Sequence, residues 1–413
     1  ENYTRLALYP FVGESDPDLF KDFDKSEEKQ ARLEQYKKEY KDEIEFFKFR
    51  QFIAQKEHKT AKERINSNGQ KLFGDCLIGF SNQEIWAHKD AFLPNTSIGL
   101  YTWGLPALDF DKILDSDSAA HKVFDDKISF FLENFDGIRF DVGWCYAIAR
   151  TENDDHLEKK YDMKQDLFKF IEKRAKEIKG EDFDTVNLIY EMDGFNELFD
   201  WSKNPPKPLE NVRGRVSVLT NEYQHDNGLG WGHPKFFEKT GLSGDEIIMG
   251  TNNHDGSNLR QLSESNEKEA IEKRNNTAEI LSKELDIPKD KILSDGKEFV
   301  KAKFAQLYTS KNRFFFFADV LGSKVDVDDQ TPNPENYRLR VNKDFERQYH
   351  TALQKGRGFN AMEAMSYVMR ARGLNKTDKE LYDKVCYYGE FLREKGPKTE
   401  KEANKKEMRE AGL

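Results

Sequence analysis

Short runs of apolar residues, each ending in a polar or glycine-containing segment, recur along most of this chain. Apolar runs bounded by turn signals are typical of buried strands. Helical patterns lie between the runs, for example at His156–Ile178, Glu267–Glu284 and Lys297–Tyr308. Strands that alternate with helices predict a parallel sheet covered by helices. The predicted strands are Lys71–Phe80, Gly137–Val142, Val186–Glu191, Arg215–Tyr223, Glu246–Thr251 and Phe314–Val320.

The N-terminal part has a different pattern. Residues 16–66 are dense in Glu, Lys and Gln, with apolar residues at helical spacing, which predicts helices with one buried face. An eight-stranded barrel needs two strands more than the six above, and residues 1–66 offer only the short apolar run Leu6–Val12. We therefore predict an α/β fold of the TIM (β/α)8 type whose N-terminal strands are missing or divergent.

This prediction divides the chain into three parts. Residues 1–66 form a helical segment that leads into the barrel, residues 67–372 form the catalytic barrel region with strands three to eight, and residues 373–413 form a charged helical tail. Long loops are expected after two of the strands, at Ser81–Phe110 and Met192–Asn211.

Composition and charge narrow the function. The 413 residues carry a net charge of −10 with both signs interspersed, and no basic stripe with interleaved aromatic residues is present. Nucleic acid is therefore not an expected partner, and an acidic protein repels anionic membranes in the mean field. A neutral substrate such as a sugar fits this charge better.

The three cysteines, Cys76, Cys145 and Cys386, stand far apart without a Cys-x-x-Cys spacing, so neither a zinc site nor a redox motif is expected. A low, odd count suits a reducing compartment, and we predict a cytoplasmic protein. No apolar run approaches the length of a membrane helix. We expect no metal and no cofactor.

Two strand ends carry carboxylates beside informative neighbours. Arg139 and Asp141 are two residues apart, so they project from the same side of a strand. An arginine there keeps the aspartate ionised, as a nucleophile requires, although a structural Arg–Asp pair is the simpler explanation. Glu191 ends an apolar strand, where desolvation raises a carboxyl pKa toward the range of a general acid; a helix cap or a loop salt bridge is the alternative.

A third strand runs into Asn252, Asn253, His254 and Asp255, followed by Gly256. This is a dense set of groups that can bind sugar hydroxyls, and a polar turn or a metal pair is the alternative. Together the three strand ends are more specific than each alone. Retaining glycosidases need a nucleophilic carboxylate and an acid/base carboxyl roughly 5 Å apart, and parallel strands bring their carboxyl ends together.

These signatures resemble the α-amylase superfamily, and their surroundings resemble its amylomaltase branch, glycoside hydrolase family 77, whose members are 4-α-glucanotransferases. The similar segments run in the family's order between about residues 43 and 372. They are Phe46–Phe52, Leu72–Ile78, Glu84–Ala87, Tyr101–Pro106, Gly137–Asp141, Phe317–Gly322 and Asn336–Arg340.

The resemblance implies a role for each matching residue. Asp141 would be the nucleophile and Glu191 the acid/base, while Asp255 would complete the catalytic trio. Arg139 would hold Asp141 charged. Malto-oligosaccharides or α-glucan would be the substrates. The residues that would bind sugar are Arg139, His254, Asp75, Trp103, Tyr101 and Asn253.

The chain departs from the family after the nucleophile, where Val142–Tyr146 replaces the usual His-Phe-Arg-Gly-Phe. This puts the substrate-length preference and the acceptor subsites in doubt. Three alternatives to transfer of glucan segments stay open: an α-glucan hydrolase, a non-catalytic glucan-binding relic, and an unrelated metal-dependent barrel hydrolase.

Overall fold

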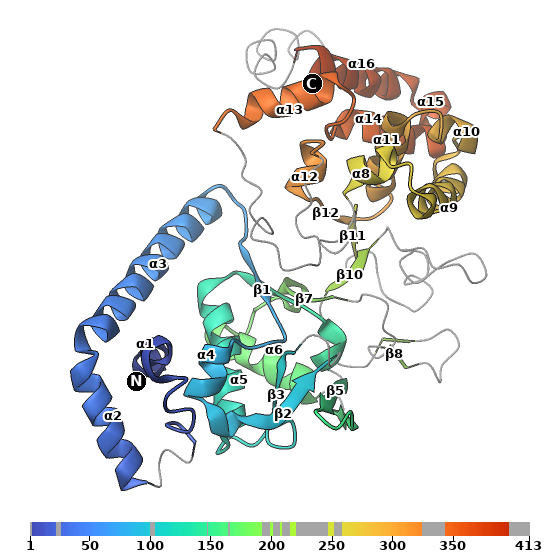
Figure 1. Cartoon of the computed structure of the whole chain (residues 1–413). Helices are drawn as coiled ribbons and strands as arrows, with labels where there is room; N and C mark the ends of the chain where they lie inside the picture. Colours follow the sequence, from blue (N-terminus) through green and yellow to red (C-terminus); the bar gives the residue numbers. More distant parts are fainter. Residues whose placement is uncertain are drawn as a thin grey trace. The chain divides into compact units, whose positions relative to one another are not determined.

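The structure is a computed structural model of the chain (Figure 1). It describes residues 2–21, 26–99, 104–146, 148–163, 166–191, 199–200, 207–208, 215–219, 247–251, 258–323 and 343–395. The chain divides into two compact units, residues 1–216 and residues 217–413. Each is described by itself.

The first unit begins with three helices, α1 (Asn2–Val12), α2 (Glu27–Glu39) and α3 (Lys41–Ser67). Their apolar faces meet in one cluster that includes Leu8 and Ile44 and extends to Trp86 of α4 (Asn82–Ala87). The predicted helices of residues 16–66 are therefore present, and the apolar run Leu6–Val12 lies in helix α1.

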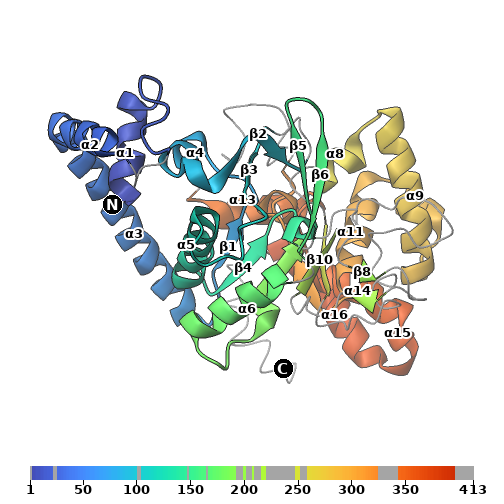
Figure 2. The ribbon, with the colours of Figure 1, turned by 90° about the horizontal axis from the view of Figure 1, so that it is seen from below.

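A parallel sheet forms the centre of the first unit, with the strand order β1 (Phe73–Cys76), β4 (Gly137–Phe140) and β7 (Leu188–Glu191). All three strands lie within predicted ones. Helices α5 (Ala119–Asn134) and α6 (Asp166–Lys179) pack together, and both views show them alongside these strands (Figures 1 and 2). Ile138, Phe140 and Leu188 are buried in the resulting core.

A second, antiparallel sheet was not expected. Its strand order is β3 (Pro106–Leu108), β2 (Phe92–Ile98), β5 (Ile148–Asn153) and β6 (Glu158–Asp162). The prediction of a long loop over Ser81–Phe110 is therefore wrong, and so is the start of the predicted helix His156–Ile178, because β6 occupies residues 158–162 and α6 begins at Asp166. β6 has one buried residue, Tyr161, so its strand conformation depends on pairing with β5.

The second unit is mainly helical. In chain order its helices are α8 (Leu259–Glu264), α9 (Lys268–Leu285), α10 (Lys289–Ile292), α11 (Gly296–Leu307), α12 (Phe317–Val320), α13 (Phe345–Gln354), α14 (Ala361–Ala371), α15 (Leu374–Thr377) and α16 (Lys379–Lys395). They enclose a core of their own, in which Leu281 and Phe299 are fully buried. The predicted helices at Glu267–Glu284 and Lys297–Tyr308 correspond to α9 and α11.

Strand β11 (Ile247–Gly250) pairs in parallel with β12 (Asn312–Phe314). The strand predicted at Phe314–Val320 is therefore misplaced, because most of that run is helix α12. The side chain of Asp319 in α12 accepts hydrogen bonds from Thr251 Oγ1 at 2.6 Å and from the Leu259 N–H at 2.8 Å. These contacts fix the helical turn. The described strands also include the short strands β8 (Phe199–Asp200), β9 (Lys207–Pro208) and β10 (Arg215–Leu219).

Parallel strands covered by helices confirm the α/β class. The described residues show no closed barrel, so the TIM barrel stays a prediction. In the part of the chain that the structure describes, no helix combines the length and the apolar character that crossing a membrane requires.

Candidate active site

One arginine joins the carboxylates at the ends of three adjacent strands. Asp75 of β1 and Arg139 of β4 are paired in register. Arg139 Nη1 donates to Asp75 Oδ1 at 2.6 Å and to Asp141 Oδ1 at 3.2 Å, while Nη2 donates to Glu191 Oε1. The structure therefore brings together four of the predicted site residues, and a single guanidinium spans the distance between Asp141 and Glu191.

Glu191 is the most enclosed of the three carboxylates, with 4% of the residue exposed. Its second oxygen, Oε2, accepts the backbone N–H of Val142 at 3.1 Å. The predicted burial at this strand end is confirmed. The contact with Arg139 was not predicted, so one side-chain cation and one backbone donor hold the two oxygens of this carboxyl group.

Arg139 stays protonated in the site. Burial lowers its pKa, but the neighbouring carboxylates of Glu191 and Asp75 outweigh that effect and raise the pKa above its ordinary value. Three carboxylates facing one permanent cation leave an excess of negative charge. That excess suits a reaction in which positive charge develops on a neutral substrate, as in the oxocarbenium-like transition state of glycoside cleavage.

A strained turn follows Asp141. Val142 has φ 51°, a left-handed conformation that is costly for a β-branched residue. In this conformation the Val142 N–H donates a hydrogen bond to the Glu191 side chain. A methyl group on the next residue, Gly143, would lie 2.8 Å from the Glu191 carbonyl oxygen and 2.9 Å from its nitrogen. Only glycine allows the chain to pass this close to Glu191.

Aromatic side chains pack together next to the ends of strands β4 and β7. Phe140 of β4 stacks on Tyr190 of β7 with ring centroids 5.0 Å apart, and Phe168 of α6 meets Tyr190 edge-on at 4.7 Å. All three side chains are buried. Since Asp141 and Glu191 directly follow Phe140 and Tyr190, this packing fixes the strands that carry the two carboxylates.

Sequence reasoning did not single out Val142 and Gly143 as parts of the site. The one available signal was their position directly after Asp141, where the chain departs from the family pattern. The predicted residues Asp255, His254, Asn253, Tyr101 and Trp103 lie outside the described residues. Within the described ranges, no group of three or more His, Cys, Asp or Glu side chains is arranged to hold a metal ion.

The fold and the site define an α/β protein with clustered carboxylates at the ends of adjacent parallel strands, the arrangement that carbohydrate-active enzymes use. Residues 7–191 match the family model described as 4-alpha-glucanotransferase, glycoside hydrolase family 77. All four described site residues fall within the match. The family indicates 4-alpha-glucanotransferase activity and implies a retaining mechanism.

Two solved structures are similar to this chain. Amylomaltase from Streptococcus agalactiae in complex with acarbose has a TM-score of 0.60 and 18% identity, with 84% of this chain and 70% of that one covered. Amylomaltase from Corynebacterium glutamicum has a TM-score of 0.54 and 14% identity, with 72% of this chain and 46% of that one covered. These likenesses show an amylomaltase-like α/β fold. No curated protein gave a significant match.

Proposed function

We propose that this chain transfers α-1,4-glucan segments between malto-oligosaccharides by a retaining double displacement. One observation carries the proposal: Arg139 contacts Asp141 and Glu191 at the ends of neighbouring parallel strands, within the part of the chain that matches the family model. Retention needs two carboxyl groups this close together, one on each side of the scissile bond.

In the first step Asp141 attacks the anomeric carbon while Glu191 protonates the glycosidic oxygen, so the bond to the leaving sugar breaks as a glucosyl ester forms on Asp141. In the second step Glu191 takes the proton from the 4-hydroxyl of the acceptor, whose oxygen displaces Asp141. Glu191 exchanges its contact with Arg139 for the glycosidic oxygen when substrate binds. The double displacement requires no metal or organic cofactor.

The remaining parts of the proposal follow from the resemblance. Asp255 completes the catalytic trio. Asp75, Arg139, Asn253, His254, Tyr101 and Trp103 bind sugar. A TIM (β/α)8 barrel spans residues 67–372, with residues 1–66 as its helical entry and residues 373–413 as a helical tail. Free cysteines, two of them buried, agree with a reducing, cytoplasmic location. Malto-oligosaccharide or α-glucan is the partner, with no role for nucleic acid or membrane.

Incubation with maltotriose tests this function. Transfer gives a ladder of longer oligosaccharides together with glucose and maltose. Asp141→Asn and Glu191→Gln should each abolish the ladder, whereas Asp111→Asn, at an exposed carboxylate of the same unit, should leave it unchanged.

Each other outcome has a definite meaning. Glucose and maltose without longer products would identify a hydrolase. Turnover that survives Asp141→Asn would refute the mechanism, and a wild-type chain that binds maltotriose without converting it would be a binding protein. Turnover abolished by a chelator would point to a metal-dependent hydrolase.

A further inference from the structure

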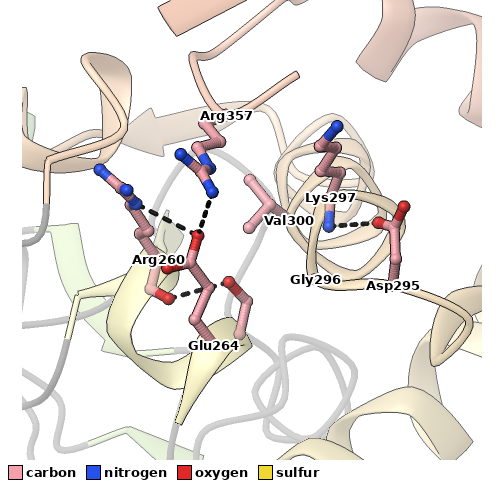
Figure 3. Close-up of a pocket in the computed structure, with 8 residues that line it drawn as sticks. Arg260, Glu264, Asp295, Gly296, Lys297, Val300 and Arg357 are labelled. Carbon is pink, nitrogen blue, oxygen red and sulfur yellow. Dashed lines mark hydrogen bonds and ion pairs between the residues drawn. The ribbon is translucent and has the colours of Figure 1, made fainter. Parts of the chain in front are cut away.

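The second unit contains a cavity of about 230 Å³ lined mainly by charged side chains (Figure 3). Arg260 and Glu264 come from α8, Lys297 and Val300 from α11, and Arg357 from the segment between α13 and α14. The figure shows both guanidinium groups directed toward Glu264, and Val300 between Arg357 and Lys297. The cavity lies outside the segment that matches the family model.

The two carboxylates of the cavity are already engaged. Glu264 Oε1 accepts a hydrogen bond from Arg260 Nε at 3.2 Å and forms an ion pair with Arg357 Nη2 at 3.0 Å. Asp295 Oδ1 accepts the backbone N–H groups of Lys297 at 2.6 Å and Glu298 at 3.0 Å, and so caps helix α11. Three cations against two carboxylates leave one positive charge in excess.

Lys297 and Arg357 supply the donors that remain. Among the described residues, nothing engages the Lys297 ammonium group, and Arg357 uses one guanidinium nitrogen, Nη2, for its contact with Glu264. The two side chains belong to one wall, because a methyl group on Gly356 would lie 3.1 Å from Lys297 Cδ. Gly356 directly precedes Arg357, so the backbone beside Arg357 lies close to the Lys297 stem.

We propose that this cavity binds one small ligand through a phosphate group, either inorganic phosphate or a phosphorylated sugar. A guanidinium fork matches the geometry of phosphate oxygens, and a lysine adds a point charge that balances the second negative charge. Among the described residues, no aromatic side chain lines the cavity, so these residues offer no stacking surface for a neutral glucan. The net charge of −10 opposes anions at long range, so attraction depends on these local cations.

Isothermal titration of the full chain with inorganic phosphate, and separately with a hexose 6-phosphate, tests the proposal. We expect saturable binding of at least one of the two at one site per chain. Lys297→Gln and Arg357→Gln should each weaken it about tenfold, which corresponds to ~1.4 kcal/mol. Lys273→Gln and Arg347→Gln, which remove cations outside the cavity, serve as matched controls and should bind as the wild type does.

The titration also tells the two ligand sources apart. Tighter binding of the hexose 6-phosphate assigns the cavity to a sugar phosphate, and equal binding assigns it to phosphate alone. Absence of saturable binding of both ligands, or equal affinity in all variants, would overturn the proposal. Lys297 has no partner among the described residues, so its substitution leaves the fold intact even where Arg357→Gln does not. Because the readout is binding, its failure leaves the proposed glucan transfer untouched.

Discussion

At the scale of single residues, the site depends on Arg139, which contacts three carboxylates at once. The spacing of Arg139 and Asp141 predicted their pairing, since residues two apart share one face of a strand. The contacts of Arg139 with Asp75 and Glu191 depend on the register between neighbouring strands, which a single strand's sequence does not encode. The arginine therefore organises the whole cluster, and removing it should affect stability and activity together.

Arg139→Met should lower the free energy of unfolding by about 2–3 kcal/mol, because three carboxylates would then face one another without a cation. This is below the range for fully buried pairs, since 20% of the Arg139 side chain is exposed. Glucan transfer should fall at least about 100-fold, or ~2.7 kcal/mol. Denaturant titration and the maltotriose assay measure the two effects.

Arg174→Met is the matched control. Arg174 pairs with Asp125 and Glu177 on the surface of α5 and α6. Its substitution should lower the free energy of unfolding by less than about 1 kcal/mol and leave glucan transfer unchanged. Equal losses in both variants would mean that the Arg139 cluster is an ordinary surface network.

The turn Val142–Gly143 holds Glu191 from two directions, by a hydrogen bond to its side chain and by close passage along its backbone. Gly143→Ala should force the turn away from Glu191, because the added methyl group would sit 2.8 Å from the carbonyl oxygen. We expect a loss of about 1–3 kcal/mol in stability.

The same substitution should reduce kcat of transfer about tenfold or more, with a changed pH profile, since the acid/base group loses its backbone donor. Gly389→Ala in α16 controls for the change of residue type, because its added methyl group would meet the flexible Glu363 side chain at 3.1 Å and no backbone atom closer than the Glu363 nitrogen at 3.3 Å. A Gly143→Ala enzyme with wild-type kcat and pH profile would show that the turn does not position Glu191.

At the scale of elements, the parallel strands and the long helices followed from local pattern. β1, β4 and β7 are apolar runs with turn signals, and α9 and α11 have clear helical spacing, so sequence alone placed them within a few residues. The antiparallel strands escaped detection because they lack such runs. β2 contains Pro94, Asn95 and Thr96, and β6 is exposed except at Tyr161. The conformation of β2 depends on β5, a partner distant in sequence, and that of β6 depends on β5, the strand that directly precedes it.

The grouping of Asp141 with Glu191 could be predicted from the sequence, because each residue stands at the end of a strand that is visible as an apolar run. The role of the strained turn was not, since nothing in the letters of Val142 and Gly143 indicates a positive φ at a valine. Helix α11 holds a further feature that pattern alone did not reveal. Lys303 is fully buried, and its Nζ donates to Gln306 Oε1 at 3.2 Å.

Burial lowers the pKa of Lys303 to about 7, against the opposing influence of Glu284 and Asp319. An unfolded lysine titrates near ~10.4, so between these values the unfolded state binds more protons. The free energy of unfolding should therefore rise with pH from about 7 upward, with a slope approaching ~1.4 kcal/mol per pH unit from this group.

Lys303→Met should remove this contribution, and Lys301→Met, at a partly exposed lysine paired with Glu298, should keep it. Denaturant titrations at pH 7, 8 and 9 give the three slopes. Parallel pH profiles for wild type and Lys303→Met would show that Lys303 stays protonated throughout this range.

At the scale of the whole molecule, the family match and the likeness of fold cover different lengths. The family model ends at residue 191, inside the first unit, whereas the likeness to the Streptococcus agalactiae amylomaltase covers 84% of the chain. The likeness of fold therefore extends into the second unit, beyond the residues that match the family model. Its core has buried positions contributed by α8, α9, α11 and α14.

The division of the chain into two compact units predicts two unfolding transitions in scanning calorimetry. Ile128→Ala in α5 and Leu281→Ala in α9 each empty a fully buried position, at a cost of about 2–5 kcal/mol. Ile128→Ala should lower the midpoint of one transition and Leu281→Ala that of the other, because each cavity weakens the unit that contains it. A single transition that both substitutions lower to the same degree would mean that the two units unfold as one cooperative body.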